Sequence, residues 1–188
     1  MRQTAQDWQV ERAQRVVVMG DGAPWIWNLA EEHFPQALEM VDYYHAVEHL
    51  WACGEALWGN RDTSPATQGW VRRYRRLLKR GRVDRVLAAI ERGKQGRPLS
   101  NTAGTTVRRN LEYFRINRHR MQYDRYRRLK LPIGTGAVEG SCKFVVQARF
   151  KKPGARWSEC GLRHMLDLKL ARLNQQWETL WPHLRLVG

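Results

Sequence analysis

The hydrophobic positions of this chain form blocks whose period predicts strands first and helices afterwards. The first block is RVVVM at 15–19, a β-branched run that stops at Gly20-Asp21-Gly22 and predicts a buried strand. The sequence WIWNLAEEHFP at 25–35 has helical spacing, and ALEMVDYYH at 37–45 predicts a second strand. Strand, helix and strand in this order indicate a parallel pair of strands in an α/β layer.

From residue 46 onward the pattern becomes helical. Glycines at 59, 81 and 93 are expected to end three of the helices. The predicted helices are AVEHLWACGEALWG at 46–59, WVRRYRRLLKRG at 70–81, VDRVLAAIERG at 83–93, and one long helix from about Ala103 to Arg128.

A Pro- and Gly-rich turn at 131–136 precedes two further predicted helices. Glu139 falls in the first turn of the first of them, whose shared face is Val138, Cys142, Val145 and Arg149. The last helix, at 161–177, is expected to turn Leu162, Leu166, Leu170, Leu173 and Trp177 toward the core. The predicted fold class is therefore α/β and mostly helical, in three segments: 1–45, 46–130 and 131–188.

Charge is concentrated in one part of the chain. The net charge is +15, and residues 70–130 hold 20 Lys and Arg against 4 Asp and Glu, which leaves 13 basic against 14 acidic residues elsewhere. Clustered arginines commonly neutralise phosphates, although a solvated helix face would have the same composition. The candidate DNA-binding residues are Arg72, Arg73, Arg75, Arg76, Lys79, Arg80, Arg108, Arg109, Arg118 and Arg120.

Cysteine spacing and hydropathy limit the cellular compartments and the kinds of site that this sequence fits. The three cysteines lack CxxC spacing, which argues against a disulfide framework and against a cysteine-built zinc site. No stretch approaches the ~20 apolar residues of a membrane span, and the first residues lack the apolar core of a signal peptide. We expect a cytoplasmic, nucleoid-associated protein with no membrane partner.

Three acidic positions are candidates for chemistry. Asp21 ends a predicted strand between glycines, Asp42 and His45 follow the second strand, and Glu139 begins a helix. Each has an ordinary alternative: a turn aspartate, a polar strand terminus and a helix-dipole acid, respectively. Their order around a separate basic block makes a combined site a reasonable hypothesis.

Several stretches together resemble a known family. GDGAPWIWNLA, VDYYHAVEHLW, YFRINRHRMQYDRYRRLKLPIGTGAVEGSCK and ARFKKPGARWS closely resemble the C-terminal half of DDE transposases of bacterial Mutator-like, ISKra-type insertion sequences. The resemblance runs in the same order from about Arg15 to Trp181. It implies an RNase-H-like catalytic core, interrupted by a helical insertion before the last catalytic acid.

By this resemblance, Asp21 is the second catalytic carboxylate and Glu139 the third, and both bind metal. Asp42 and His45 match an acid-x-x-His motif that supports the active site. Two Mg²⁺ (or Mn²⁺) ions roughly 3.5–4 Å apart are expected to promote cleavage and strand transfer at phosphorus. The implied partners are transposon-end and target DNA, a second copy of the chain, or a full-length transposase.

The chain also departs from this family. The first catalytic Asp of the family lies on an earlier strand, and only about 14 residues precede RVVVM, too few for the missing elements. Asp7 does not replace it, and the DNA-end recognition region is missing as well. We therefore expect a truncated or frameshifted remnant that does not catalyse transposition alone.

Two other functions compete with this one. His45-Ala46-Val47-Glu48-His49 reads as H-x-x-E-H, the inverted zincin motif of a zinc metalloprotease. The basic block alone also fits a non-enzymatic helical protein that binds nucleic acid. Neither alternative uses Asp21 and Glu139 together.

Overall fold

The computed structural model describes residues 2–7, 9–96 and 98–180. The chain divides into two compact units, Met1–Thr135 and Gly136–Gly188, and each is described by itself below. The predicted segments 1–45 and 46–130 both lie in the first unit.

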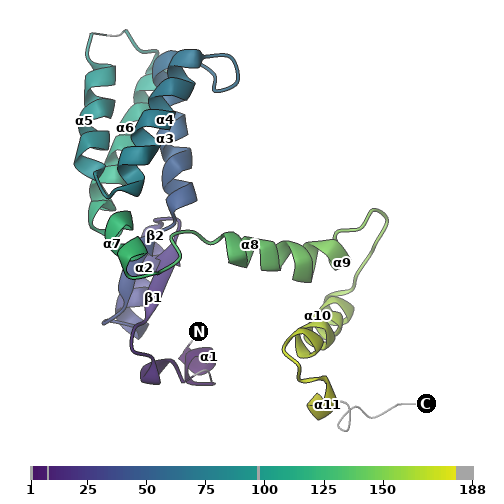
Figure 1. The fold of residues 1–188 in the computed structure, drawn as a ribbon. Coiled ribbons are helices and arrows are strands. Elements are labelled where there is room, and N and C mark those ends of the chain that lie inside the picture. Colours follow the sequence, from purple (N-terminus) through teal and green to yellow (C-terminus); the bar gives the residue numbers. More distant parts are fainter. Residues whose placement is uncertain (1, 8, 97, 181–188) are drawn as a thin grey trace. The chain divides into compact units, whose positions relative to one another are not determined.

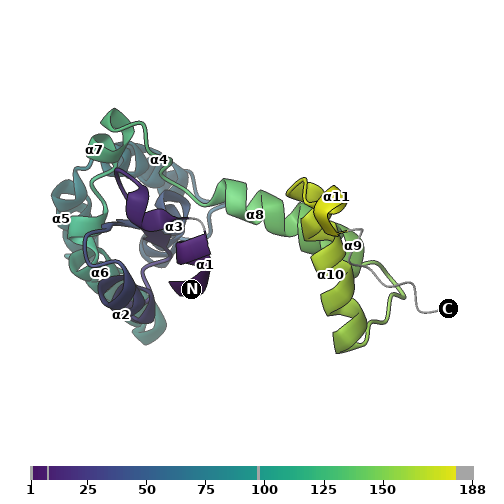
Figure 2. The same cartoon turned by 90° about the horizontal axis from the view of Figure 1, so that it is seen from below.

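The first unit contains a small parallel sheet. Strands β1 (Val17–Gly20) and β2 (Leu38–Val41) pair in parallel, with Val17 opposite Leu38 and Gly20 opposite Val41. Helix α2 (Pro24–His33) connects them, so the predicted strand, helix and parallel strand are confirmed. A short helix α1 (Arg2–Asp7) and a 3₁₀ helix (Val10–Arg12) precede β1, and Figure 2 shows α1 and α2 from below.

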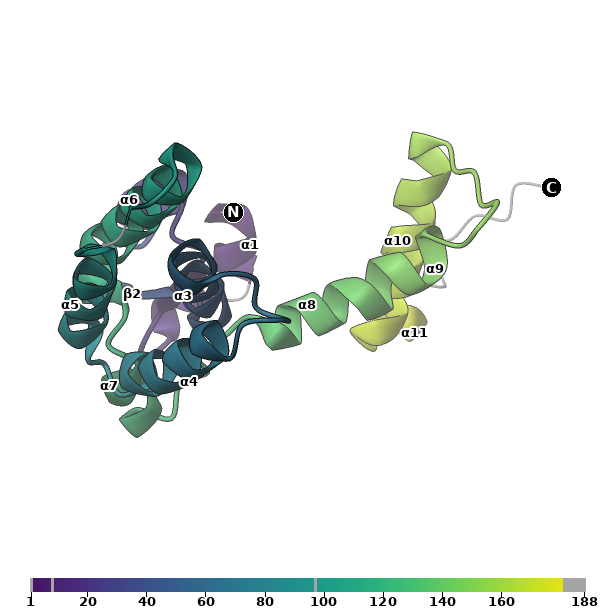
Figure 3. The same cartoon turned by 90° about the horizontal axis from the view of Figure 1, so that it is seen from above.

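Four helices that pack against one another form a bundle, which supplies much of the remaining core. They are α3 (Tyr43–Trp58), α4 (Pro65–Lys79), α5 (Val83–Lys94) and α6 (Asn101–Ile116). Helix α3 packs against α4 and α6, and α5 closes the bundle by packing against both of these (Figures 1 and 3). Their apolar faces bury side chains that include Leu50, Cys53, Leu78, Val86, Ile90, Val107 and Phe114. The fold is thus mostly helical α/β with a two-stranded parallel sheet.

Local sequence explains where the bundle helices begin. Ser64 and Ser100 accept hydrogen bonds from the amides of Thr67 and Ala103, each three residues on, which is N-capping. Pro65 follows Ser64 in the first turn, where its fixed φ suits a helix. The expected stop at Gly93 is wrong by a residue, because Gly93 lies inside α5, which ends at Lys94.

The long helix expected from Ala103 to Arg128 is broken in the structure. Helix α6 ends at Ile116, a 3₁₀ helix covers Arg118–Arg120, and α7 covers Tyr123–Arg128. The buried Asn117 donates to the carbonyl of Tyr113, so its amide competes with helix continuation. The break lets the side chains of Tyr123 and Tyr126 enter the core, where both are fully buried.

The described part of the second unit consists of helices joined by turns and loops. Its elements are α8 (Gly136–Cys142), a π-helical turn (Lys143–Gln147), α9 (Ala148–Phe150), α10 (Glu159–Leu173) and α11 (Trp177–Leu180). Phe150 packs edge-on against Trp157, and Lys169 donates to the carbonyl of Phe144 at 2.6 Å.

The predicted core side of the last helix is mostly wrong: Leu162, Leu170, Leu173 and Trp177 are exposed, and only Leu166 is partly buried. On the predicted shared face of the preceding helix, Val138 and Cys142 are exposed and Val145 is partly buried, while Arg149 lies outside the residues whose side chains are described. Helix α10 contacts the π-helical turn of this unit, yet most of its leucine face stays exposed. Among the described helices, none has both the length and the apolar character to cross a bilayer.

Candidate functional site

Asp21 lies directly after β1, as predicted, with an exposed side chain. Its Oδ1 accepts a hydrogen bond from the amide of Ala23 at 2.8 Å, and its carbonyl accepts one from the hydroxyl of Tyr113 at 2.8 Å. Gly22 has φ +101°, and a Cβ there would lie 2.6 Å from the Tyr113 ring. A glycine is required at 22 so that Tyr113 can hold the loop that carries Asp21.

Asp42 lies directly after β2 and is 1% exposed. Its Oδ1 accepts from the amides of Tyr44 and His45, and its Oδ2 accepts from both the amide and the hydroxyl of Thr135. Burial raises the pKa of Asp42, but these hydrogen bonds outweigh it and the pKa lies below its ordinary value.

Through these contacts, Asp42 has two structural roles. It caps the N-terminus of α3, which therefore begins at Tyr43 rather than at residue 46. It also ties the turn before α8 to the end of β2, through Thr135. With four donors on two oxygens, the Asp42 carboxylate is already occupied as a hydrogen-bond acceptor.

The two strand ends meet the bundle at Tyr113. Burial raises the pKa of Tyr113, and the charges of Asp21 and Asp42 raise it further, so both carboxylates act on this phenol. The ring of His49 stacks on Tyr113 with centroids 3.5 Å apart. Tyr113 of α6 thus joins the loop that carries Asp21 to His49 of α3.

His49 is held in a defined orientation. Its Nδ1 lies 2.6 Å from Oδ1 of Asn110, whose own amide donates to the carbonyl of Thr106. Because Oδ1 of Asn110 can only accept a hydrogen bond, Nδ1 of His49 is assigned the proton. In the neutral ring, Nε2 is then unprotonated. Burial lowers the pKa of His49, which favours this neutral form.

The H-x-x-E-H residues line one shallow hollow of about 340 Å³, with His45 exposed at its edge. Glu48 forms an ion pair with Arg61 at 3.2 Å, and His49 has the contacts just given. Within the described residues, His, Cys, Asp and Glu form no group of three or more that could hold a metal ion. The geometry lends no support to the zinc protease hypothesis.

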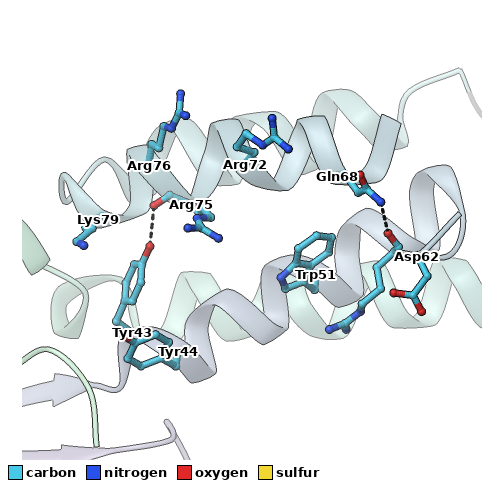
Figure 4. A pocket seen from close by; sticks show the side chains of 10 residues that line it. Tyr43, Tyr44, Trp51, Asp62, Gln68, Arg72, Arg75, Arg76 and Lys79 are labelled. Carbon is cyan, nitrogen blue, oxygen red and sulfur yellow. Dashed lines mark hydrogen bonds between the residues drawn. The ribbon is translucent and has the colours of Figure 1, made fainter. Parts of the chain in front are cut away.

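A larger hollow, of about 890 Å³, lies between α3 and α4, and we call it the α3/α4 groove (Figure 4). Its α4 side carries Gln68, Arg72, Arg75, Arg76 and Lys79, and its α3 side and the following loop carry Tyr43, Tyr44, Trp51, Arg61 and Asp62. Four of the predicted DNA-binding residues thus share one concave surface.

Two contacts fix the width of the α3/α4 groove. The hydroxyl of Tyr43 donates to the carbonyl of Arg75 at 3.2 Å, joining the start of α3 to α4 (Figure 4). At the other end, Nε2 of Gln68 donates to the carbonyl of Arg61 at 2.8 Å. The walls are therefore joined by hydrogen bonds at both ends.

Comparison with known families places the chain. The sequence model of the family described as "Uncharacterised protein family (UPF0236)" matches residues 4–180. The chain belongs to this family. Comparison with curated proteins and with solved structures gives no match. The match to UPF0236 spans both strand-end acids, the α3/α4 groove and Glu139.

The other basic candidates of this UPF0236 chain have varied surroundings. Arg73 lines a separate hollow on the α5 side of α4, and Arg80, Arg108 and Arg109 are exposed. Arg118 pairs with Asp84 at 2.8 Å, at the surface.

Arg120 differs from the rest. Its guanidinium forms an ion pair with Glu39 and lies 4.5 Å from the centroid of the Trp27 ring, and only 14% of its side chain is exposed. These contacts join the 3₁₀ helix to β2 and α2. These contacts indicate a structural role for Arg120. They give no support to the prediction that Arg120 contacts DNA.

Glu139 lies in α8, in the second unit, and its side chain falls outside those that the structure describes. The backbone agrees with the prediction that a helix begins just after the turn at 131–136. Thr135, which Asp42 binds, precedes Glu139 by four positions in the UPF0236 chain.

Sequence reasoning did not find Tyr44, Trp51, Tyr113 or Thr135. The tyrosines and Trp51 read as ordinary aromatic residues of helices, because their partners are distant in sequence. One signal was available for the Asp42 cap: an Asp directly before a helical pattern is a preferred N-cap.

Proposed function

We propose that this UPF0236 chain acts on DNA as part of the RNase-H-like catalytic core of a DDE-type transposase. The observation that carries the proposal is the order of elements. An acid follows the first of two parallel strands, a basic helical bundle comes next, and a second acid lies in the first turns of the next helix, α8. This order agrees with a helical insertion before the last catalytic acid.

The carboxylates proposed for the metal site are those of Asp21 and Glu139. Asp21 suits this role because its carboxylate is exposed, is fixed by the Ala23 amide, and is of the oxygen type that Mg²⁺ prefers. Two bound Mg²⁺ or Mn²⁺ ions would supply activation of the attacking oxygen and stabilisation of the leaving one.

The chain's own residues would position these acids. Tyr113 and Gly22 hold the loop of Asp21, and Asp42 binds Thr135, the last residue of the first unit. The arginines of α4 that line the α3/α4 groove, which are Arg72, Arg75 and Arg76, would bind backbone phosphates of the transposon end. Such contacts give salt-sensitive binding with little sequence reading.

The test is Mn²⁺ titration of the full chain by calorimetry. Asp21→Asn and Glu139→Gln are each expected to lower Mn²⁺ affinity by about tenfold or more. If both acids bind the same ions, the double variant loses little more than either single variant, because coupled residues are not additive. Glu31→Gln, at an exposed position of α2, is the matched control and should leave binding unchanged.

Additive losses would assign the two acids to separate sites and refute the shared one. Binding that does not saturate, or an equal loss in the control, would remove the metal site altogether.

A second candidate function is DNA binding without catalysis. The α3/α4 groove favours it, because the groove holds four of the predicted basic residues and needs neither acid. Duplex and single-stranded DNA binding that is unaffected by Asp21→Asn, together with no Mn²⁺ binding, would support this candidate instead.

A further inference from the structure

We propose that the α3/α4 groove binds an unpaired DNA strand, with a base stacked on Tyr44 and the phosphates along the arginines of α4. The inference rests on the proposed function, since it takes DNA to be the ligand. It deepens that function by naming the form of DNA that this surface recognises.

The cationic side of the groove is a single row along one helix face. Arg72, Arg76 and Lys79 follow one another at intervals of four and three residues, so their side chains leave α4 in nearly the same direction. All three are exposed, and Figure 4 shows Arg72 and Arg76 extending from α4. A row of this kind suits the regular negative charges of a polynucleotide backbone.

The aromatic side of the groove lies on α3. Tyr44 is 64% exposed, although its ring packs against the bare α-carbon of Gly134, where a Cβ would lie 2.6 Å from the ring. The ring is thus supported on one side and open on another. An exposed, supported aromatic ring is the usual platform on which an unpaired base stacks.

Trp51 lies seven residues after Tyr44, two helical turns further along the same face of α3. The guanidinium of Arg61 lies 5.1 Å from the centroid of its ring. Arg61 is itself fixed by Glu55, at 2.9 Å, and by Glu48, at 3.2 Å. This end of the groove is therefore rigid, with Asp62 beside it as a hydrogen-bond acceptor.

The separation of the two sides argues for an unpaired strand. One strand presents phosphates on one side and base faces and edges on the other, which matches a cationic α4 wall opposite an aromatic α3 wall. In a duplex, the faces of the bases are covered by their stacked neighbours and cannot reach Tyr44. Asp62 would repel a phosphate but can accept a hydrogen bond from a base amino group.

The experiment is a fluorescence anisotropy titration of the full chain, without divalent metal and at fixed salt, with labelled oligothymidylate and with a duplex of equal length. We expect Tyr44→Ala to weaken single-strand binding about tenfold and to leave duplex binding within about twofold. Tyr44→Phe should retain wild-type binding, because it keeps the ring. Trp25→Ala removes an equally exposed ring from α2 and should change neither titration.

A charge-matched pair tests the cationic row. Arg76→Ala, in the groove, should weaken single-strand binding several-fold, whereas Arg73→Ala, on the same helix but in a different hollow, should have little effect. Thermal unfolding of each variant shows whether the fold is retained.

The outcomes separate this inference from the proposed function. If the chain binds duplex but not oligothymidylate, or if Tyr44→Ala lowers both affinities equally, the groove assignment is wrong while action on DNA stands. If neither DNA binds, both proposals fail.

Discussion

Asp42 is a buried charge that the fold uses as an anchor. Its two oxygens accept from three backbone amides and one hydroxyl, contributed by Tyr44 and His45 in the first turn of α3 and by Thr135. Hydrogen bonds to a charged group are stronger than neutral ones, so the ionised form stabilises the folded state.

We predict that Asp42→Asn lowers the free energy of unfolding by about 2 kcal/mol at pH 7, because the new NH₂ group faces donors instead of accepting from them. Urea unfolding measures this loss. Asp167→Asn, at an exposed position of α10, should change stability by less than about 0.5 kcal/mol.

The pH dependence of this effect has a definite sign. The folded pKa of Asp42 is below its unfolded value, so the stabilisation is present above about pH 4 and is lost as pH falls through the folded pKa. The difference between wild type and Asp42→Asn should therefore shrink in acid. A constant difference from pH 7 to pH 3 would contradict the ionised anchor.

His49 also favours its deprotonated form in the folded chain, but for an imidazole that form is the neutral one. Its pKa is lowered by burial first, although the hydrogen bond to Asn110 partly opposes this, so the unfolded chain takes up a proton before the folded chain does. Stability should then fall as pH drops below about 6.5, where an ordinary imidazole titrates. In His49→Gln, the loss of stability between pH 7 and pH 5 should be smaller, as measured by urea unfolding, and an unchanged slope would count against this account.

Single residues also show how far sequence reasoning reached. Asp21 was placed correctly at a strand end, because a β-branched run followed by Gly-Asp-Gly is a local signal. Asp42 was expected at a strand end too, but its carboxylate meets Thr135, 93 positions away, which no local pattern contains.

At the scale of elements, the connection from β1 to α2 is the most constrained loop of the site. Gly22 combines φ +101° with close contact to Tyr113, so the loop fits α6 only if residue 22 has no side chain.

We predict that Gly22→Ala costs about 1–3 kcal/mol of unfolding free energy and weakens any ion binding at Asp21, because the residue is strained and displaces Tyr113. Gly104→Ala is the control in α6, where an added Cβ meets nothing within 4 Å. That change should stabilise the chain by up to about 1 kcal/mol. Equal effects of the two substitutions in thermal unfolding would contradict the loop account.

The helices show which elements are predictable. The parallel pair and the bundle helices followed from local period, and their boundaries shifted by a few residues where caps act. Local period did not predict the helix break at Asn117, because this break depends on burial of Tyr123 and Tyr126 against residues such as Tyr43. Tertiary packing overrode a helical pattern there.

At the scale of the whole molecule, the first unit has its own core and ends at Thr135. Hydrogen bonds hold the last residues of this unit to its core. The amide of Thr135 donates to Asp42, and the amide of Tyr43 donates to the carbonyl of Ile133. Leu131 and Ile133 also pack against the core.

We predict that a chain ending at Thr135 unfolds cooperatively and keeps its helix content by circular dichroism. A chain ending at Lys130 should be less stable by several kcal/mol, because Asp42 is then buried without two of its donors. Equal stability of the two shortened chains would show that the turn at 131–135 is not part of the first unit.

The sequence predicted a segment boundary after residue 130, and the first unit ends five residues later, at Thr135. The last helix has regular leucine spacing, which predicts a buried face, yet Leu162, Leu170 and Leu173 are exposed and only Leu166 is partly buried. Period indicates where an apolar face exists, but only the structure shows whether the chain itself covers it.

The basic residues of α4 have one more consequence. Arg72, Arg73, Arg75, Arg76 and Lys79 repel one another along this helix and repel Arg80 at its C-cap, and this repulsion opposes folding of the free chain. Dissolved salt screens that repulsion, but it also competes with DNA phosphates for the same side chains. Under the proposed function, salt therefore has two opposite effects on this molecule: the free protein is expected to become harder to unfold in the same buffers in which bound DNA would be released.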